Sequence, residues 1–76
     1  MERIGVACSF EASGRVRVRR IELDGRWTAV AQGRQWLDEE GRHVLVMLPD
    51  EKIKELVLSA HDLAWRLVSR PKPQAI

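Results

Sequence analysis

The most informative segment of the sequence is RVRVRRIELDGRWTAV, residues 15–30. In its middle, Asp24 and Gly25 separate two runs in which apolar and polar side chains largely alternate. A two-residue type I′ turn needs positive φ at both positions, and Asp-Gly adopts that conformation at low cost. The segment therefore predicts a β-hairpin in which Leu23 pairs with Arg26.

The alternation is interrupted before this turn. Val16 and Val18 share one face of the first predicted strand, whereas Ile21 falls on the face of the arginines. A strand can move its apolar side chains to the other face only through a bulge, a sharp coil or a crossing between sheets. We predict a bulge near residues 19–20, and a second bend at Gly33 in the strand that follows the turn.

Turn signals divide the chain into pieces of about 8 to 12 residues, a spacing typical of consecutive strands. The expected fold class is all-β, a small antiparallel meander or partly open barrel of five to six strands. The strands are expected near residues 3–11, 15–23, 26–36, 42–48, 52–58 and 63–69. The side chains expected to be buried are Val6, Cys8, Phe10, Val30, Val44, Val46, Leu56, Trp65 and Leu67.

The last third of the chain also fits a helix. Apolar side chains recur there at helical spacing, Asp50 would cap the first turn, and Pro71 would end the last one. This interpretation gives the alternative fold class α+β, an antiparallel sheet with a C-terminal helix from about residue 50 to 70.

A resemblance favours the meander. The string Leu23-Asp24-Gly25-Arg26-Trp27 is followed by Gly33-Arg34-Gln35-Trp36, Gly41-Arg42-His43-Val44-Leu45-Val46, Glu55-Leu56-Val57-Leu58 and Trp65-Arg66-Leu67. This succession resembles small bacterial proteins built as antiparallel meanders, in which a Glu-Leu strand is followed by a Trp-x-Leu strand. The resemblance implies an all-β fold, and it carries over no activity because that family has none established. The sequence departs from it in the glycine-poor turns at residues 49–52 and 59–62.

Length and composition describe one small domain. The chain has 76 residues, 45% of them apolar and 32% charged, and we expect a domain at residues 1–70 with a flexible Pro-containing tail at 71–76. No apolar run approaches the roughly 18 residues of a membrane-spanning helix, and we expect no secretory signal. Cys8 is the one cysteine, so no internal disulfide can form. These features predict a soluble cytoplasmic protein that does not interact with membranes.

The sequence carries none of the common enzyme signatures, such as a phosphate-binding glycine loop or a cysteine pair for zinc. Cys8 stands at an apolar strand position, where cysteine most often packs as a small hydrophobic side chain. His43 follows the acidic residues 38–40 and could form a metal site with His61, but the loose spacing favours a solvated acidic turn and two surface histidines. We predict that the protein is not an enzyme and holds no metal or other cofactor.

Arginine dominates the basic residues of the first half. Residues 1–36 carry seven arginines against four acidic residues, although the net charge of the chain is only +2. Arginines on a strand with aromatic rings nearby are typical of small β-domains that bind single-stranded nucleic acid. The predicted contact face consists of Arg15, Arg17, Arg19, Arg26 and Arg34, with Trp27 and Trp36 nearby.

Two interpretations of these arginines stay open. In one, the protein acts by binding, and its partner is single-stranded nucleic acid or an acidic protein surface. In the other, the arginines are the solvent face of an amphipathic strand that discourages aggregation, and the tryptophans belong to the core.

A different function follows from an excess of apolar residues. Leu45, Met47, Val57, Ala64 and Val68 lie opposite the predicted core positions, and a domain this small cannot cover both faces of a sheet. An all-β fold therefore predicts a homodimer or a larger partner. The corresponding function is that of a protein-interaction or homo-oligomeric structural module without a nucleic-acid role.

Overall fold

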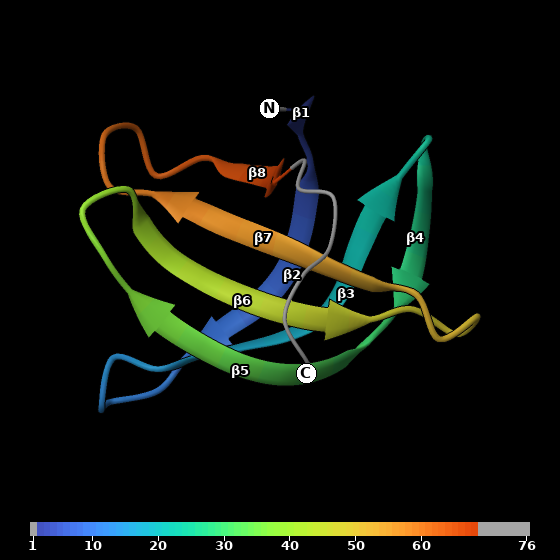
Figure 1. The fold of residues 1–76 in the computed structure, drawn as a ribbon, viewed down its shortest axis with the longest axis horizontal. Coiled ribbons are helices and arrows are strands. Elements are labelled where there is room, and N and C mark those ends of the chain that lie inside the picture. Colours follow the sequence, from blue (N-terminus) through green and yellow to red (C-terminus); the bar gives the residue numbers. More distant parts are fainter. Residues whose placement is uncertain (1, 69–76) are drawn as a thin grey trace.

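A computed structural model describes residues 2–68 of the chain. These residues form eight β-strands and no helix, arranged in two antiparallel sheets of five and three strands (Figure 1). The all-β fold class is confirmed, and the two sheets are not closed into a barrel. Residues 53–59 and 65–68 are strands, so the alternative with a C-terminal helix is wrong.

The strands follow one another as an antiparallel meander. They are β1 (Glu2–Arg3), β2 (Gly5–Phe10), β3 (Val16–Leu23), β4 (Arg26–Ala29), β5 (Ala31–Leu37), β6 (Gly41–Met47), β7 (Ile53–Ser59) and β8 (Trp65–Val68). The five-stranded sheet has the order β1-β8-β7-β6-β5, and the three-stranded sheet has the order β2-β3-β4. The tail predicted at residues 71–76 lies outside the described residues.

Two of the six predicted strands serve both sheets. Ile4 separates β1 from β2, and Val30 separates β4 from β5. The N–H of Ile4 donates to the carbonyl of Trp65, and the N–H of Val30 donates to the carbonyl of Arg19, both at 3.1 Å. Backbone hydrogen bonding therefore continues where the chain passes from one sheet to the other, and a single core lies between the sheets (Figure 1).

The predicted hairpin is confirmed. Leu23 pairs with Arg26, which leaves a two-residue turn with a φ of 50° at Asp24 and 76° at Gly25. Positive φ at both central positions matches the type I′ turn, whose twist suits the flanking strands.

The predicted bulge in β3 is confirmed as well. Ala7 of β2 pairs with Arg20, whereas the next residue, Cys8, pairs with Val18. Arg19 is therefore the extra residue of a bulge. The bulge allows Val18 and Ile21 to point into the same core, although regular alternation would place them on opposite faces.

The second predicted bend is found in β5. Gln32 pairs with Val46 and Gln35 pairs with Val44, so the register shifts across Gly33 and Arg34. Glycine at this position lets the strand bend around the core.

Two glutamines complete the hydrogen bonding of β3 where β4 has ended. Gln32 Oε1 accepts from the N–H of Val18 at 2.6 Å, and Gln35 Oε1 accepts from the N–H of Val16 at 3.0 Å. The carbonyl of Val16 accepts from the Nε2 groups of both glutamines, at 2.9 and 2.8 Å. Side chains of β5 thus replace a backbone partner for β3 and join the two sheets.

Replacing Gln32 with alanine is expected to lower the free energy of unfolding by about 1 to 3 kcal/mol, because the N–H of Val18 loses its partner. Urea denaturation monitored by tryptophan fluorescence measures the change. Lys52→Ala in an exposed turn is the control and is expected to stay within about 0.5 kcal/mol of wild type. An equal stability of wild type and Gln32→Ala would contradict this role of the glutamine.

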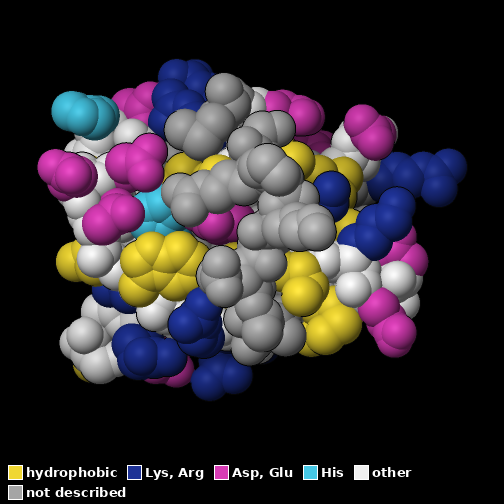
Figure 2. Space-filling view, in the orientation of Figure 1, with side chains coloured by type: hydrophobic (Ala, Val, Ile, Leu, Met, Phe, Trp, Pro, Cys, Tyr) yellow, Lys and Arg dark blue, Asp and Glu magenta, His cyan; other side chains and the backbone are white. Residues whose placement is uncertain are grey.

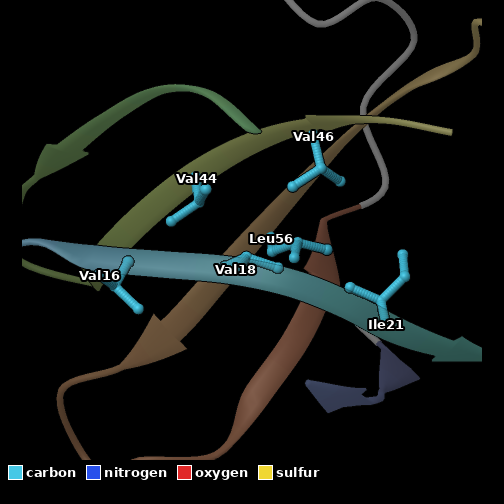
Figure 3. Close-up of a cluster of buried hydrophobic side chains, with 6 residues drawn as sticks. All are labelled: Val16, Val18, Ile21, Val44, Val46 and Leu56. Carbon is cyan, nitrogen blue, oxygen red and sulfur yellow. The ribbon is translucent and has the colours of Figure 1, made fainter. Parts of the chain in front are cut away.

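The core consists of aliphatic side chains from three strands, drawn in Figure 3. Its fully buried members are Val16, Val18, Ile21, Val44, Val46 and Leu56. The predictions for Val44, Val46 and Leu56 are confirmed. Of the other predicted core residues, Val6, Cys8, Val30, Trp65 and Leu67 pack against this cluster and stay partly exposed.

The prediction that Phe10 is buried is wrong. Its side chain is 59% exposed, although its alternation places it on the same face as Cys8. Phe10 is the last residue of β2 and stands next to the turn at residues 11–15, at the margin of the two-layer core. Alternation predicts the face of a side chain but not where the opposite sheet ends.

The outer face of the five-stranded sheet also carries apolar side chains. Leu45 and Val57, which were predicted to need a cover, are buried, whereas Met47, Ala64 and Val68 are half-buried. A homodimer or a larger partner on this face stays a prediction.

Candidate functional site

The predicted contact arginines lie on both sheets. Arg17 and Arg19 belong to β3, Arg26 belongs to β4, and Arg15 directly precedes β3. Arg34 belongs to β5 in the five-stranded sheet. All five side chains are exposed.

The outer face of the three-stranded sheet combines arginines with small residues. Arg17 pairs with Ser9, and Arg20 pairs with Ala7 on one side and with Ala29 on the other. These positions alternate with the core-facing ones, so they share the solvent face. Because the neighbouring side chains are small, the arginines stand above an open sheet surface. Arg20 also lies on this face, although the predicted contact face did not include it.

Trp27 lies on this same face. It pairs with Glu22, and the residue is 52% exposed. The ring reaches across Glu22 towards Gly5, where a Cβ atom would stand 3.0 Å from the ring and 2.9 Å from a carboxylate oxygen of Glu22. The absence of a side chain at Gly5 therefore makes room for the indole against the sheet. The interpretation that all three tryptophans belong to the core does not hold for Trp27.

Arg26 and Arg34 are placed differently. Arg26 pairs with Leu23, whose side chain packs against the core, so its register position belongs to the inner face at the end of the hairpin. The guanidinium carbon of Arg34 lies 5.8 Å from the ring centroid of Trp36, a cation–π contact in the other sheet. The structure thus places Arg17, Arg20 and Trp27 on one face of the three-stranded sheet, with Arg19 at the bulge between the two arginines and without Arg26 or Arg34.

The arginines of this face are weakly engaged. Arg17 forms an ion pair with Glu11 at 3.3 Å, in which both side chains are exposed. Such an exposed ion pair contributes little to stability in water and is weakened by salt. The side chains of Arg19 and Arg20 form no hydrogen bond or ion pair with any of residues 2–68. These three guanidinium groups are available to an anionic partner.

The acidic turn before β6 surrounds a buried histidine, which corrects the prediction of two surface histidines. His61 is exposed, but His43 is 0% exposed. Its Nδ1 lies 2.8 Å from Oε2 of Glu55, which is itself buried. Its Nε2 lies 2.8 Å from Oδ1 of Asp38 and 3.8 Å from Oε1 of Glu40. Three carboxylates therefore surround one imidazole.

Asp38 is positioned by the turn that it begins. Its Oδ1 accepts hydrogen bonds from the N–H groups of Glu40 at 2.9 Å and Gly41 at 3.3 Å. Desolvation acts to raise the pKa of Asp38, but the hydrogen bonds from His43 and from these N–H groups together hold that pKa below its ordinary value. Asp38 is therefore a carboxylate at neutral pH.

Glu55 reaches the histidine from the neighbouring strand. It pairs with Leu45, two residues beyond His43 in β6, so the two side chains are diagonal neighbours on one face. Trp36 of β5 pairs with His43 and stacks on its imidazole, with the ring centroids 5.1 Å apart and the planes inclined by 3°. The imidazole is thus held by residues from three adjacent strands.

A second charged cluster lies at the β7–β8 turn. Asp62 accepts hydrogen bonds from Arg66 at 2.7 and 3.1 Å and from Arg3 at 3.2 Å. The Arg66 guanidinium holds the pKa of Asp62 far below its usual range, and Asp62 raises the pKa of Arg66. An open depression borders this cluster and the acidic turn, lined by Glu39, Glu40, Val57, Ser59, His61, Asp62 and Arg66. Figure 2 shows acidic side chains gathered beside histidine at this end of the molecule.

Cys8 packs against the core and is partly exposed. Burial raises the pKa of its thiol, opposed in part by a hydrogen bond with Trp65. The thiol is therefore protonated at neutral pH, a state that does not favour nucleophilic attack.

Among residues 2–68, no helix is long and apolar enough to cross a membrane. No protein-family model, curated protein or solved structure matches the chain. The function is therefore inferred from the geometry of the molecule.

Proposed function

We propose that the protein is a cytoplasmic binding module and not an enzyme, and that it binds single-stranded nucleic acid on the outer face of the three-stranded sheet. One observation carries this proposal. The half-exposed ring of Trp27 shares an open sheet face with Arg17 and Arg20, and small residues lie between them.

Each component of this face suits a single strand. A base has an apolar face that can stack on an exposed indole, and such stacking contributes about 1 to 3 kcal/mol per base regardless of sequence. The planar guanidinium groups of Arg17, Arg19 and Arg20 can each donate paired hydrogen bonds to a phosphate. The alanine and serine side chains beside Arg17 and Arg20 let the strand approach the sheet closely there.

Titration of a labelled mixed-sequence oligonucleotide at two salt concentrations tests the proposal. Three phosphate contacts predict that log K falls with log salt with a slope of about −2, since each contact on a single strand contributes about −0.7. The triple variant Arg17→Gln/Arg19→Gln/Arg20→Gln is expected to lose most of the affinity and the salt dependence. Trp27→Ala is expected to weaken binding about five- to 150-fold, whereas Trp27→Phe keeps a stacking ring.

A matched control distinguishes the effect of this face on binding from the effect of net charge. Arg3→Gln/Arg34→Gln/Lys52→Gln removes the same three charges from residues outside the three-stranded sheet and is expected to bind almost as wild type does. An equal loss in both triple variants would place the contact elsewhere. If wild type does not bind at low salt, the nucleic-acid proposal is wrong, and an acidic protein partner becomes the better candidate for the arginines.

A further inference from the structure

We propose that Asp38, Glu40 and His43 form a binding site for a divalent transition-metal ion such as Zn²⁺, with His43 Nε2 and one oxygen of each carboxylate as ligands. This site lies at the end of the five-stranded sheet and is independent of the proposed nucleic-acid face. It revises the expectation that the histidines and the acidic turn hold no metal.

The donor atoms are already close together. One ligand atom from each of the three residues lies within 4.8 Å of the other two. The distances from His43 Nε2 to the carboxylate oxygens of Asp38 and Glu40 are 2.8 and 3.8 Å. A tetrahedral zinc ion with ligands at about 2.0 to 2.2 Å requires separations of about 3.3 to 3.5 Å between donor atoms. Both distances from Nε2 therefore lie within about half an ångström of those that a coordination site requires.

The hydrogen-bond geometry of His43 suits a metal ligand. A neutral imidazole has one N–H, but both ring nitrogens face a carboxylate oxygen at 2.8 Å. If Nδ1 donates to the buried Glu55, Nε2 is the atom that faces the carboxylates of Asp38 and Glu40, where a metal ion would replace the proton on Nε2.

Glu55 supplies the outer contact that histidine ligands of metals usually have. Its carboxylate accepts from Nδ1, which fixes the tautomer that presents Nε2 to the ion and makes the imidazole a stronger ligand. Trp36 stacks on the ring and fixes its orientation. The pair of His43 and Glu55 is buried, whereas Asp38 and Glu40 are exposed, so an ion can enter from solvent and keep a water ligand.

Isothermal titration of the purified, metal-free protein with Zn²⁺ tests the site, and Co²⁺ provides a visible spectrum of the coordination. Wild type is expected to bind one ion. Asp38→Asn and Glu40→Gln each remove one anionic ligand in an exposed turn and are expected to raise Kd at least about tenfold. Glu55→Gln is expected to raise Kd about 10- to 100-fold through the orientation of His43.

Two control variants make the outcome specific. Glu39→Gln removes the same charge from the same exposed turn, and His61→Gln removes the other histidine; both are expected to stay within about twofold of wild type. Equal weakening of Zn²⁺ binding by Glu39→Gln would show that the effect is one of general electrostatics. Loss of Zn²⁺ binding in His61→Gln would show that the site includes His61. Absence of Zn²⁺ binding by the folded wild type, together with two protonated imidazole nitrogens in ¹⁵N NMR spectra of His43, would overturn the proposal in favour of a bound proton.

Discussion

Replacing Gly41 with alanine is expected to lower the free energy of unfolding by more than about 3 kcal/mol, enough to unfold much of a domain of this size. Gly41 has a φ of 143°, a conformation that residues with a side chain rarely adopt. A Cβ atom there would overlap the carbonyl oxygen of Leu58 and stand 2.9 Å from the nitrogen of Ala60. These are backbone atoms of β7 and of the residue that follows it, so they cannot yield as the end of a flexible side chain can.

Gly14 and Gly25 provide the comparison for this variant. Both have positive φ, 89° and 76°, but a Cβ atom at either position would meet no atom within 4 Å. Alanine there is expected to cost only the conformational strain, about 1 kcal/mol. Urea denaturation of the three variants measures the difference. If Gly41→Ala were no less stable than Gly25→Ala, the close approach of β6 and β7 would be wrong.

The local rules of strands predict much of this fold from the sequence. Alternation of side chains and the Asp24-Gly25 turn predict the hairpin in its correct register. The change of parity between Val18 and Ile21 predicts the bulge, because a regular strand cannot bury both side chains in one core. These features involve only neighbours in the chain, so sequence alone describes them.

The passage of a strand between sheets is not visible in the sequence. Ile4 and Val30 look like ordinary strand residues, yet they divide their strands between two sheets. Their positions depend on where strands far along the chain begin and end. The exposure of Phe10 has the same origin, since its face is correctly predicted and only the extent of the opposing layer is not.

The buried histidine shows what sequence reasoning missed at the acidic turn. His43 has the parity of Leu45, and Glu55 has that of Val57, so each polar residue interrupts an apolar face. Such an interruption on two neighbouring strands is a signal for a buried polar pair. Using this signal requires the register of β6 and β7. That register depends on the glycine-poor turn at residues 49–52, and the sequence left open whether the segment after this turn is a strand or a helix.

Leu56→Ala is expected to lower the free energy of unfolding by about 2 to 5 kcal/mol. Leu56 is 0% exposed and pairs with Val44 on one side and Leu67 on the other, in the middle of the five-stranded sheet. Truncation removes its apolar contacts and leaves a cavity that the two-layer core can fill only in part. Leu67→Ala is expected to cost less, because Leu67 is already partly exposed.

Phe10→Ala is the control that separates burial from side-chain size. Phenylalanine is larger than leucine, so a cost set by size alone would rank Phe10→Ala above Leu56→Ala. Because Phe10 is 59% exposed at the end of β2, we expect its truncation to cost less than about 1 kcal/mol. The midpoints of urea denaturation compare the stabilities of the variants when the slope of the unfolding free energy against urea concentration is unchanged. A larger loss for Phe10→Ala than for Leu56→Ala would mean that Phe10 is covered in solution, which would direct the search for a partner surface to the end of β2.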